Sequence, residues 1–161
     1  MKKEMSSQAA AASMIRAYMK ANGYVGSVSS SSYAGGNSVR VGVVDLPPER
    51  IQPLKEYAGQ FQQGHFDGMI DLYEYSNVDK SVPQVKFVFV ENRASDEMRQ
   101  SIWDYMKARY AGMEGAPADA KDAGSFRNEN FCEYGDRLIY RLFAGGYNNS
   151  QYWDSIAALV A

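Results

Sequence analysis

The sequence predicts an α+β fold, with a mainly antiparallel sheet of about five to six strands and helices packed on one face. Three observations favour this class. Valines alternate with other residues from Val39 to Val43, the period of a strand with one apolar face. Apolar residues recur at helical spacing from Leu54 to Phe61, as in a helix that packs on a sheet. Segments of the two kinds then follow in the order α, β-hairpin, α, β, β, α, β, β, α.

The N-terminal segments predict a helix, a hairpin and a second helix. Residues 7–22 carry apolar side chains at helical spacing and precede Gly23, which suits a helix end. The serine-rich run before Tyr33 is interpreted as a strand that pairs, through the AGGN turn at 34–37, with the valine strand. A flexible linker is the alternative for these serines. Pro53 fits the first turn of a helix over about 52–62.

The middle of the chain predicts two strands and a well-capped helix. Residues 69–75, MIDLYEY, alternate as a strand does. Residues 82–92, VPQVKFVFVEN, are apolar on both faces, which favours a central position in the sheet. Ser95 is a suitable N-cap for a helix with acidic residues in its first turn and Arg109 in its last.

The C-terminal part predicts a loop, two strands and a last helix. Residues 112–124 have the composition of an exposed loop. FRNENFCEY and DRLIYRLFAGGY are interpreted as strands that turn near Tyr134–Asp136, and NNSQYWDSIAALVA as a helix. At 161 residues the chain is expected to form a single domain over 1–161.

Composition bears on several functional classes and makes nucleic-acid binding less favoured without excluding it, since a local basic patch could still provide it. The formal net charge of −2 lacks the basic surplus expected of a protein that grips phosphate backbones. The single cysteine, Cys132, fits a reducing compartment, and no apolar run is long enough for a membrane span. The N-terminal lysines precede an interrupted apolar segment, so we interpret it as a helix and expect a cytoplasmic protein. Twelve tyrosines indicate half-exposed surfaces and an interface.

FQQGHFDGM, residues 61–69, holds the only histidine. His65 is a candidate proton-transfer group that Asp67 would orient, and Cys132 would be a nucleophile if His65 lay nearby. The structural interpretation is preferred: Phe61 closes the helix stripe, Phe66 plugs the core, and two glycines, Gly64 and Gly68, provide backbone freedom. One histidine and one cysteine exclude the common zinc clusters, so no metal and no cofactor are expected.

Three segments together carry a family resemblance. They are SVSSSSYAGGNSVRVGVVDLPP, FQQGHFDGMIDLYEY and QVKFVFVENRASDEM, in that order. They resemble the large polyvalent protein-associated domains of phages and conjugative plasmids, of the type that contains Phe-x-x-Gly-x-Phe-Asp-Gly-Met. The resemblance covers about residues 10–110 and leaves about 112–161 as a C-terminal extension. The family usually has Asp-Gly-Pro after the second strand, whereas this chain has Asp45-Leu46-Pro47-Pro48.

The resemblance implies a setting on mobile elements and provides no catalytic residues. The leading hypothesis is a non-enzymatic protein that binds a host or partner protein, for example an anti-CRISPR or anti-restriction inhibitor in a bacterial host. The residues assigned to its binding surface are Tyr33, His65, Asp67, Tyr73 and Tyr75.

Two alternatives stay open. One is a nucleic-acid-binding accessory domain, in which cations gather on one sheet face beside exposed tyrosines. Those cations would be Arg40, Lys86, Arg93, Arg127, Arg137 and Arg141. The other is an enzyme that uses His65 and Asp67.

Overall fold

The computed structural model describes residues 5–145, and the chain divides into two compact units, one up to Arg93 and one from Ala94. The expectation of a single domain over residues 1–161 remains a prediction. The helix expected in NNSQYWDSIAALVA, residues 148–161, lies outside the described residues.

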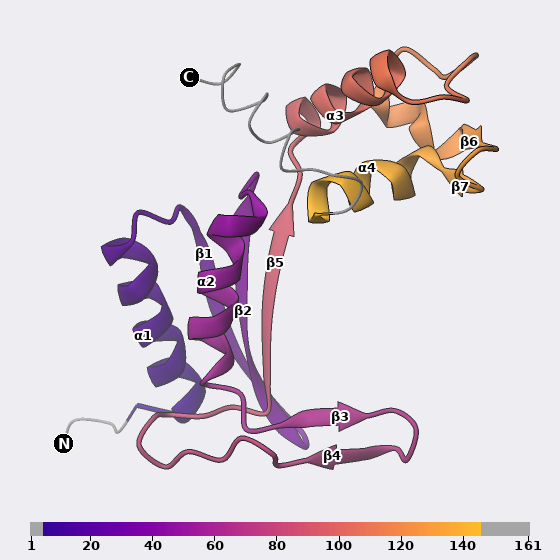
Figure 1. Ribbon diagram of the computed structural model, residues 1–161. Helices are drawn as coiled ribbons and strands as arrows, with labels where there is room; N and C mark the ends of the chain where they lie inside the picture. Colours follow the sequence, from indigo (N-terminus) through magenta and orange to yellow (C-terminus); the bar gives the residue numbers. More distant parts are fainter. Residues whose placement is uncertain (1–4, 146–161) are drawn as a thin grey trace. The chain divides into compact units, whose positions relative to one another are not determined.

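The first unit is built on a three-stranded sheet in the order β1-β2-β5 (Figure 1). β1 (Gly26–Tyr33) and β2 (Gly36–Val44) form the predicted antiparallel hairpin, so the serine run is a strand and the linker alternative is wrong. β5 (Phe87–Arg93) joins β2 in parallel. The fold class is α+β as predicted, but the largest sheet in the described residues has three strands, not five or six.

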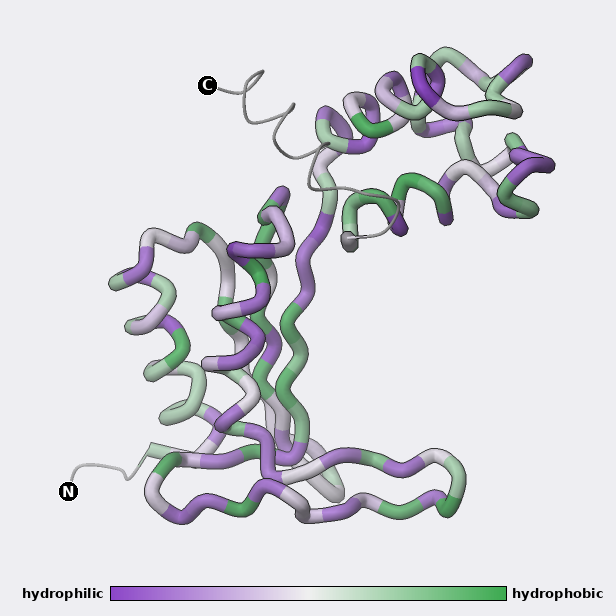
Figure 2. The backbone as a smooth tube through the Cα atoms, viewed as in Figure 1, coloured by the Kyte–Doolittle hydropathy of each residue, from purple (hydrophilic) through white to green (hydrophobic). Residues whose placement is uncertain are grey.

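The most apolar strand lies at an edge of this sheet, where the sequence predicted a central position. Figure 2 shows that β5 is hydrophobic through its middle and hydrophilic toward Arg93. Its apolar residues lie in two different environments. Val88 and Val90 pack against the core of the unit, whereas Phe89 on the other face is exposed. The two apolar faces of β5 therefore have different causes: the valines face the core, and the phenylalanines lie on a face that the helices do not cover. They do not indicate a position between two other strands.

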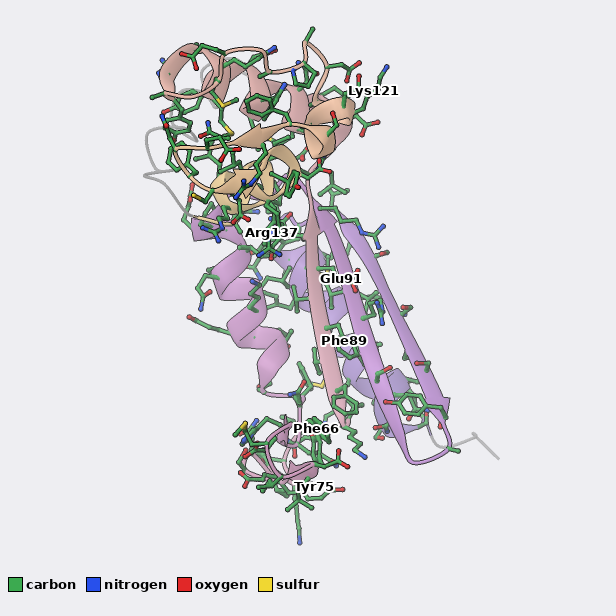
Figure 3. All side chains as sticks on the ribbon, turned by 90° about the vertical axis from the view of Figure 1, so that its right-hand side faces the viewer. Phe66, Tyr75, Phe89, Glu91, Lys121 and Arg137 are labelled. Atoms are coloured by element: carbon green, nitrogen blue, oxygen red, sulfur yellow. The ribbon has the colours of Figure 1, made fainter. Side chains whose placement is uncertain are left out.

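A hairpin arm formed by β3 (His65–Asp67) and β4 (Leu72–Glu74) leaves the sheet between α2 and β5 (Figures 1 and 3). The strand expected over 69–75 is shorter because the side chain of Asp67 accepts a hydrogen bond from the Met69 N–H and Asp71 adopts a left-handed conformation. Phe66 lies on this arm and is 52% exposed. The prediction that Phe66 plugs the core is therefore wrong.

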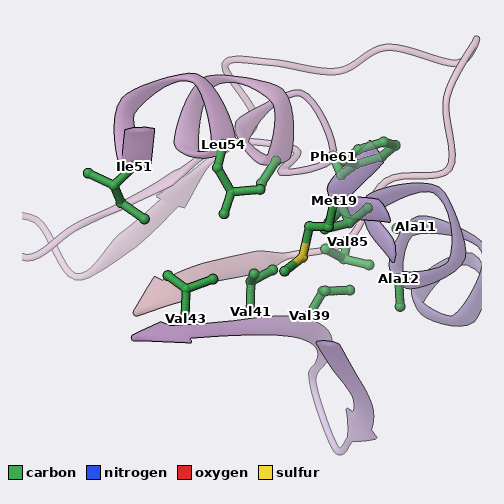
Figure 4. Packing of buried hydrophobic residues seen from close by; sticks show 12 residues of the cluster. Ala11, Ala12, Met19, Val39, Val41, Val43, Ile51, Leu54, Phe61 and Val85 are labelled. Carbon is green, nitrogen blue, oxygen red and sulfur yellow. The ribbon is translucent and has the colours of Figure 1, made fainter. Parts of the chain in front are cut away.

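Helices α1 (Ser7–Ala21) and α2 (Pro48–Gly59) cover one face of the sheet, as predicted. α2 begins earlier than expected, so that Pro48 lies in its first turn and Pro53 inside the helix. The core between the helices and β2 is shown in Figure 4. It consists of Ala11, Ala12, Ile15, Met19, Val39, Val41, Val43, Ile51, Leu54, Ala58, Phe61 and Val85.

The second unit contains α3 (Asp96–Arg109), the 3₁₀ helix η1 (Ala120–Ser125), β6 (Arg127–Asn128), β7 (Glu133–Tyr134) and α4 (Gly135–Ala144). The predicted cap of α3 is confirmed, since the Ser95 hydroxyl accepts a hydrogen bond from the Met98 N–H at 3.1 Å. Trp103 is fully buried in the core of this unit and donates its indole N–H to the Pro117 carbonyl at 2.7 Å.

The prediction of a strand in DRLIYRLFAGGY is wrong, because these residues form most of α4. Leu138, Ile139, Leu142 and Phe143 are all buried, and their spacing is that of a helix stripe and not of a strand. The preceding segment, FRNENFCEY, contributes only the two short strands β6 and β7. Cys132, just before β7, has a φ of 52°, which interrupts extended backbone.

Candidate binding surface

The sheet of the first unit has one face that α1 and α2 do not cover. Val39, Val41 and Val43 point toward the helices, so the intervening residues of β2 point the other way. The strand register places Ser38 beside Phe87 and Arg40 beside Phe89. Tyr33, at the end of β1, pairs with Gly36 on this same face. The uncovered face thus has serines along β1 and aromatic side chains along β5.

Four aromatic rings continue this face onto the hairpin arm, and we call them the aromatic ladder: Tyr75, Tyr73, Phe87 and Phe89. The ring centroids of Tyr75 and Tyr73 are 4.9 Å apart, and those of Tyr73 and Phe87 are 5.4 Å apart, both edge to face. Phe87 and Phe89 stack at 6.0 Å. Tyr75 is 62% exposed and Phe89 41% exposed, so both ends of the ladder are accessible to a partner. Figure 3 shows Phe89 on β5 and Tyr75 on the arm.

Two cations lie against the ladder. The Lys86 ammonium is 5.2 Å from the Tyr73 ring centroid and 5.8 Å from that of Phe87, and it donates to the Gly35 carbonyl at 3.1 Å. The Arg40 guanidinium is 5.0 Å from the Phe89 centroid. Each distance lies within the range of a cation–π contact. The cations therefore hold the rings in place as well as adding charge.

A glutamate neutralises much of the charge on this face. Glu91 forms an ion pair with Arg40 and a second one with Arg93, the latter at 3.2 Å. The pairs are partly exposed and contribute little to stability. Their effect is on the surface itself, because an arginine already paired with a carboxylate is less available to a phosphate.

The arm is attached to β5 through Tyr73. Its hydroxyl donates to the Lys86 carbonyl, and burial raises the pKa of this phenol above its ordinary value of 10.0. A hydrogen bond from the Gly64 backbone acts in the opposite direction but is the smaller effect. Tyr73 thus fixes the part of the aromatic ladder that lies on the arm, Tyr73 and Tyr75, to the sheet.

The raised pKa of Tyr73 predicts a pH dependence of stability. Because the folded pKa lies above the unfolded one, the contribution is complete below pH 10 and is lost as the pH rises through the folded pKa. We expect Tyr73→Phe to remove this alkaline component and to lower the free energy of unfolding near pH 7 by about 1 kcal/mol, through loss of the hydrogen bond. Urea unfolding of the unsubstituted protein and of Tyr73→Phe between pH 7 and pH 11 measures both the alkaline loss and the difference in stability near pH 7. An alkaline loss of the same size in both would contradict this role for Tyr73.

Of the five residues assigned to a binding surface, Tyr73 and Tyr75 belong to the ladder, and Tyr33 lies near it across Gly36. His65 and Asp67 lie on the other face of the arm, because they alternate with Phe66, whose partner is Tyr73. The sequence interpretation missed Phe87 and Phe89 as surface residues. The available signal was a strand with aromatic residues on one face and valines on the other.

The structure shows no hydrogen bond between His65 and Asp67. His65 Nδ1 lies 3.1 Å from the Ser76 hydroxyl, and Nε2 lies 3.4 Å from a Glu74 carboxylate oxygen. Asp67 instead accepts the Met69 N–H at 2.8 Å. Cys132 is exposed in the second unit, and its thiol donates to the Glu129 carbonyl.

The six cations proposed for a nucleic-acid platform divide between the two units. Arg40, Lys86 and Arg93 belong to the first unit. In the second unit, Arg127 pairs with Glu129, while Arg137 and Arg141 pair with Glu133. Within residues 5–145, no three His, Cys, Asp or Glu side chains form a group able to hold a metal ion. In the same part of the chain, every helix is too short or too polar to cross a bilayer.

A comparison with protein families matches residues 6–115 to the family described as large polyvalent protein associated domain 29. The chain belongs to this family. The match confirms the resemblance to the large polyvalent protein-associated domains and connects the chain to polyvalent proteins of phages and other mobile elements. Comparison with curated proteins and with solved structures found no match. The domain 29 match includes the entire aromatic ladder and extends through α3.

Proposed function

We propose that this domain 29 protein is a non-enzymatic binding protein of a mobile element, and that the aromatic ladder is its contact surface for a host or partner protein. The observation that supports this proposal most is a continuous series of ring contacts, which runs from Phe89 and Phe87 on the uncovered sheet face to Tyr73 and Tyr75 on the arm. Tyrosine, phenylalanine and arginine are enriched at protein interfaces, where their large rings bury much area with few rotatable bonds. The cation–π contacts hold the rings in place and so reduce the entropy lost on binding.

The neutralised charge of this face favours a protein partner over a nucleic acid. A phosphate backbone is bound through lysines and arginines that exchange counterions for phosphate. Here Arg40, which lies against the ladder, and Arg93, further along β5, both pair with Glu91. Among possible targets, a host defence complex such as a CRISPR or restriction assembly fits the mobile-element setting of the family, and we include this class in the proposal.

A single-stranded nucleic acid is the second candidate. Its supporting observation is Lys86, whose ammonium lies between two rungs of the ladder, since binding grooves for single strands combine aromatic stacking with basic side chains.

The test is affinity capture of the tagged protein from a bacterial lysate, with and without nuclease, read by mass spectrometry. We expect a protein partner that persists after nuclease treatment. Phe89→Ala and Tyr75→Ala should each reduce its recovery by roughly tenfold or more, because truncation of an aromatic residue that anchors an interface removes a large share of binding energy. Tyr140→Ala is the matched control: Tyr140 is 64% exposed on α4 and outside the ladder, so its loss should leave recovery unchanged.

Two results would decide against the proposal. Captured proteins that are lost after nuclease treatment, and whose recovery depends on Phe89, would support the nucleic-acid candidate. A partner recovered equally well by Phe89→Ala, Tyr75→Ala and Tyr140→Ala would show that the ladder is not the contact surface.

A further inference from the structure

A second candidate surface of the first unit is the outer edge of β5. In a parallel pair, alternate residues direct both backbone groups toward the neighbouring strand. The Arg93 carbonyl accepts a hydrogen bond from the Asp45 N–H, which continues the series of backbone hydrogen bonds between β5 and β2. Counting back by two, Glu91, Phe89 and Phe87 bond to β2, whereas Asn92, Val90 and Val88 direct their backbone groups away from it. The Val88 N–H confirms this parity, since it donates to the side chain of Gln62 and not to β2.

The chain itself occupies only the start of this edge. Gln62 forms a parallel bridge with Val85, through a bond from the Gln63 N–H to the Val85 carbonyl at 3.0 Å and one from the Val85 N–H to the Phe61 carbonyl at 2.8 Å. The Gln62 side-chain oxygen then takes the place of one more backbone acceptor at Val88, at 2.7 Å. After Gly64 the chain turns into the arm. In the described structure, the backbone groups of Val90 and Asn92 then have no hydrogen-bond partner.

A groove of about 340 Å³ lies along this edge. Val88 and Val90 line it from β5, Lys55 and Gly59 from α2, and Asn77 from the segment after the arm. A Cβ atom built on Gly59 would meet no atom within 4 Å, so the space beside α2 is open. None of the lining residues is acidic, and within the described residues Lys55 has no ion-pair partner.

We propose that this groove accepts an extended, acidic peptide segment of a partner protein, which adds as a strand to β5. The unsatisfied N–H and C=O groups of an edge strand are a template for such pairing, and backbone hydrogen bonds would provide affinity. The short bridge at Val85 sets the expected direction, since a peptide continuing its path would run parallel to β5. Lys55 provides the charge complementarity that selects an acidic side chain.

This inference does not depend on the proposed function, because the edge groove and the aromatic ladder use different residues. Experiment can therefore contradict either proposal without affecting the other. Phe89→Ala and Tyr75→Ala should leave peptide binding intact, and Gly59→Leu should leave ladder-dependent capture intact.

The experiment begins with the whole chain without ligand. In amide hydrogen exchange by NMR, the N–H groups of Val90 and Asn92 are expected to exchange fast, and those of Phe89 and Glu91 slowly. A library of random linear dodecamer peptides displayed on phage is then selected on the protein, and the best sequence is synthesised as a fluorescent probe. We expect enrichment of Asp and Glu, and new protection at Val90 and Asn92 when the probe binds.

Variants of both partners then test the mode of binding. Lys55→Glu and Gly59→Leu should each raise the Kd of the probe tenfold or more. Single N-methylation along the peptide should weaken binding at every second residue, because only alternate N–H groups face β5. Slow exchange of Val90 in the protein without probe, a selected peptide that leaves Val90 and Asn92 unprotected, or uniform tolerance of N-methylation would overturn the proposal. So would protection of these amides by self-association, which would assign the edge to a second copy of the chain.

Discussion

Phe61→Ala is expected to lower the free energy of unfolding of the first unit by about 3–5 kcal/mol, the usual effect of removing a buried aromatic ring. Phe61 is completely buried, and its ring lies edge to face with that of Tyr57 at 5.6 Å. It follows α2 at the point where the chain approaches β5. An alanine there would leave a cavity between the helices and the sheet.

Phe66→Ala is the matched control, five residues away in the same FQQGHFDGM segment. Phe66 is half exposed on the arm and faces Tyr73 across the hairpin, so its loss should change stability by less than about 1 kcal/mol. Amide exchange at Val39 and Val41, which are buried in the same core as Phe61, measures both effects without assuming that the two units unfold together. Equal losses for the two variants would contradict this division of roles.

Gly64→Ala is expected to displace the arm and lower stability by roughly 1–3 kcal/mol or more. A Cβ atom at this position would lie 1.8 Å from the Glu74 carbonyl oxygen and 2.7 Å from its carbon, so backbone would have to move. Because Tyr73 and Tyr75 flank Glu74, the movement should separate the arm from β5 and break the ladder. Loss of nuclear Overhauser contacts between the rings of Tyr73 and Phe87 would report this directly.

Gly68→Ala provides the comparison for this change. A Cβ atom at Gly68 would meet no atom within 4 Å, and its φ is not in the left-handed range, so the variant should retain both stability and ring contacts. If Gly64→Ala also retained the contact between Tyr73 and Phe87, close approach of the two arm strands would not explain this glycine.

The contrast between Phe61 and Phe66 shows which features of the fold can be predicted from the local sequence. The first helix, the serine–valine hairpin and the helix after Ser95 were predicted because periodicity, turn residues and caps act within a few positions. The role of Phe61 followed from the same helical spacing. The prediction for Phe66 failed because its burial depends on how far the arm projects from the sheet, and nothing in nine residues determines that distance.

Nonlocal pairing explains the remaining differences. The width of the sheet depends on which strands meet. The strand predicted over 69–75 was counted into the sheet, although around Tyr73 it pairs only with the segment around Phe66, which was predicted as a turn. Phe87 and Phe89 were assigned to the interior because two apolar faces usually mean burial on both. Only the placement of β5 at an edge of the first unit's sheet, beside Arg40 and on the face that α1 and α2 do not cover, identifies them as surface residues.

The parallel pairing of β2 with β5 also has a consequence for synthesis. Asn37 and Lys86, which a side-chain hydrogen bond joins at the start of this pair, are 49 positions apart, whereas β1 and β2 are consecutive. On a ribosome the hairpin and α1 are complete while β5 is still to be made. At about 5–20 residues per second, the outer edge of β2 then waits roughly 2–10 seconds for its neighbour. During that interval the nascent chain exposes a strand with three core valines and an unpaired edge, the features that make an incomplete chain prone to aggregation.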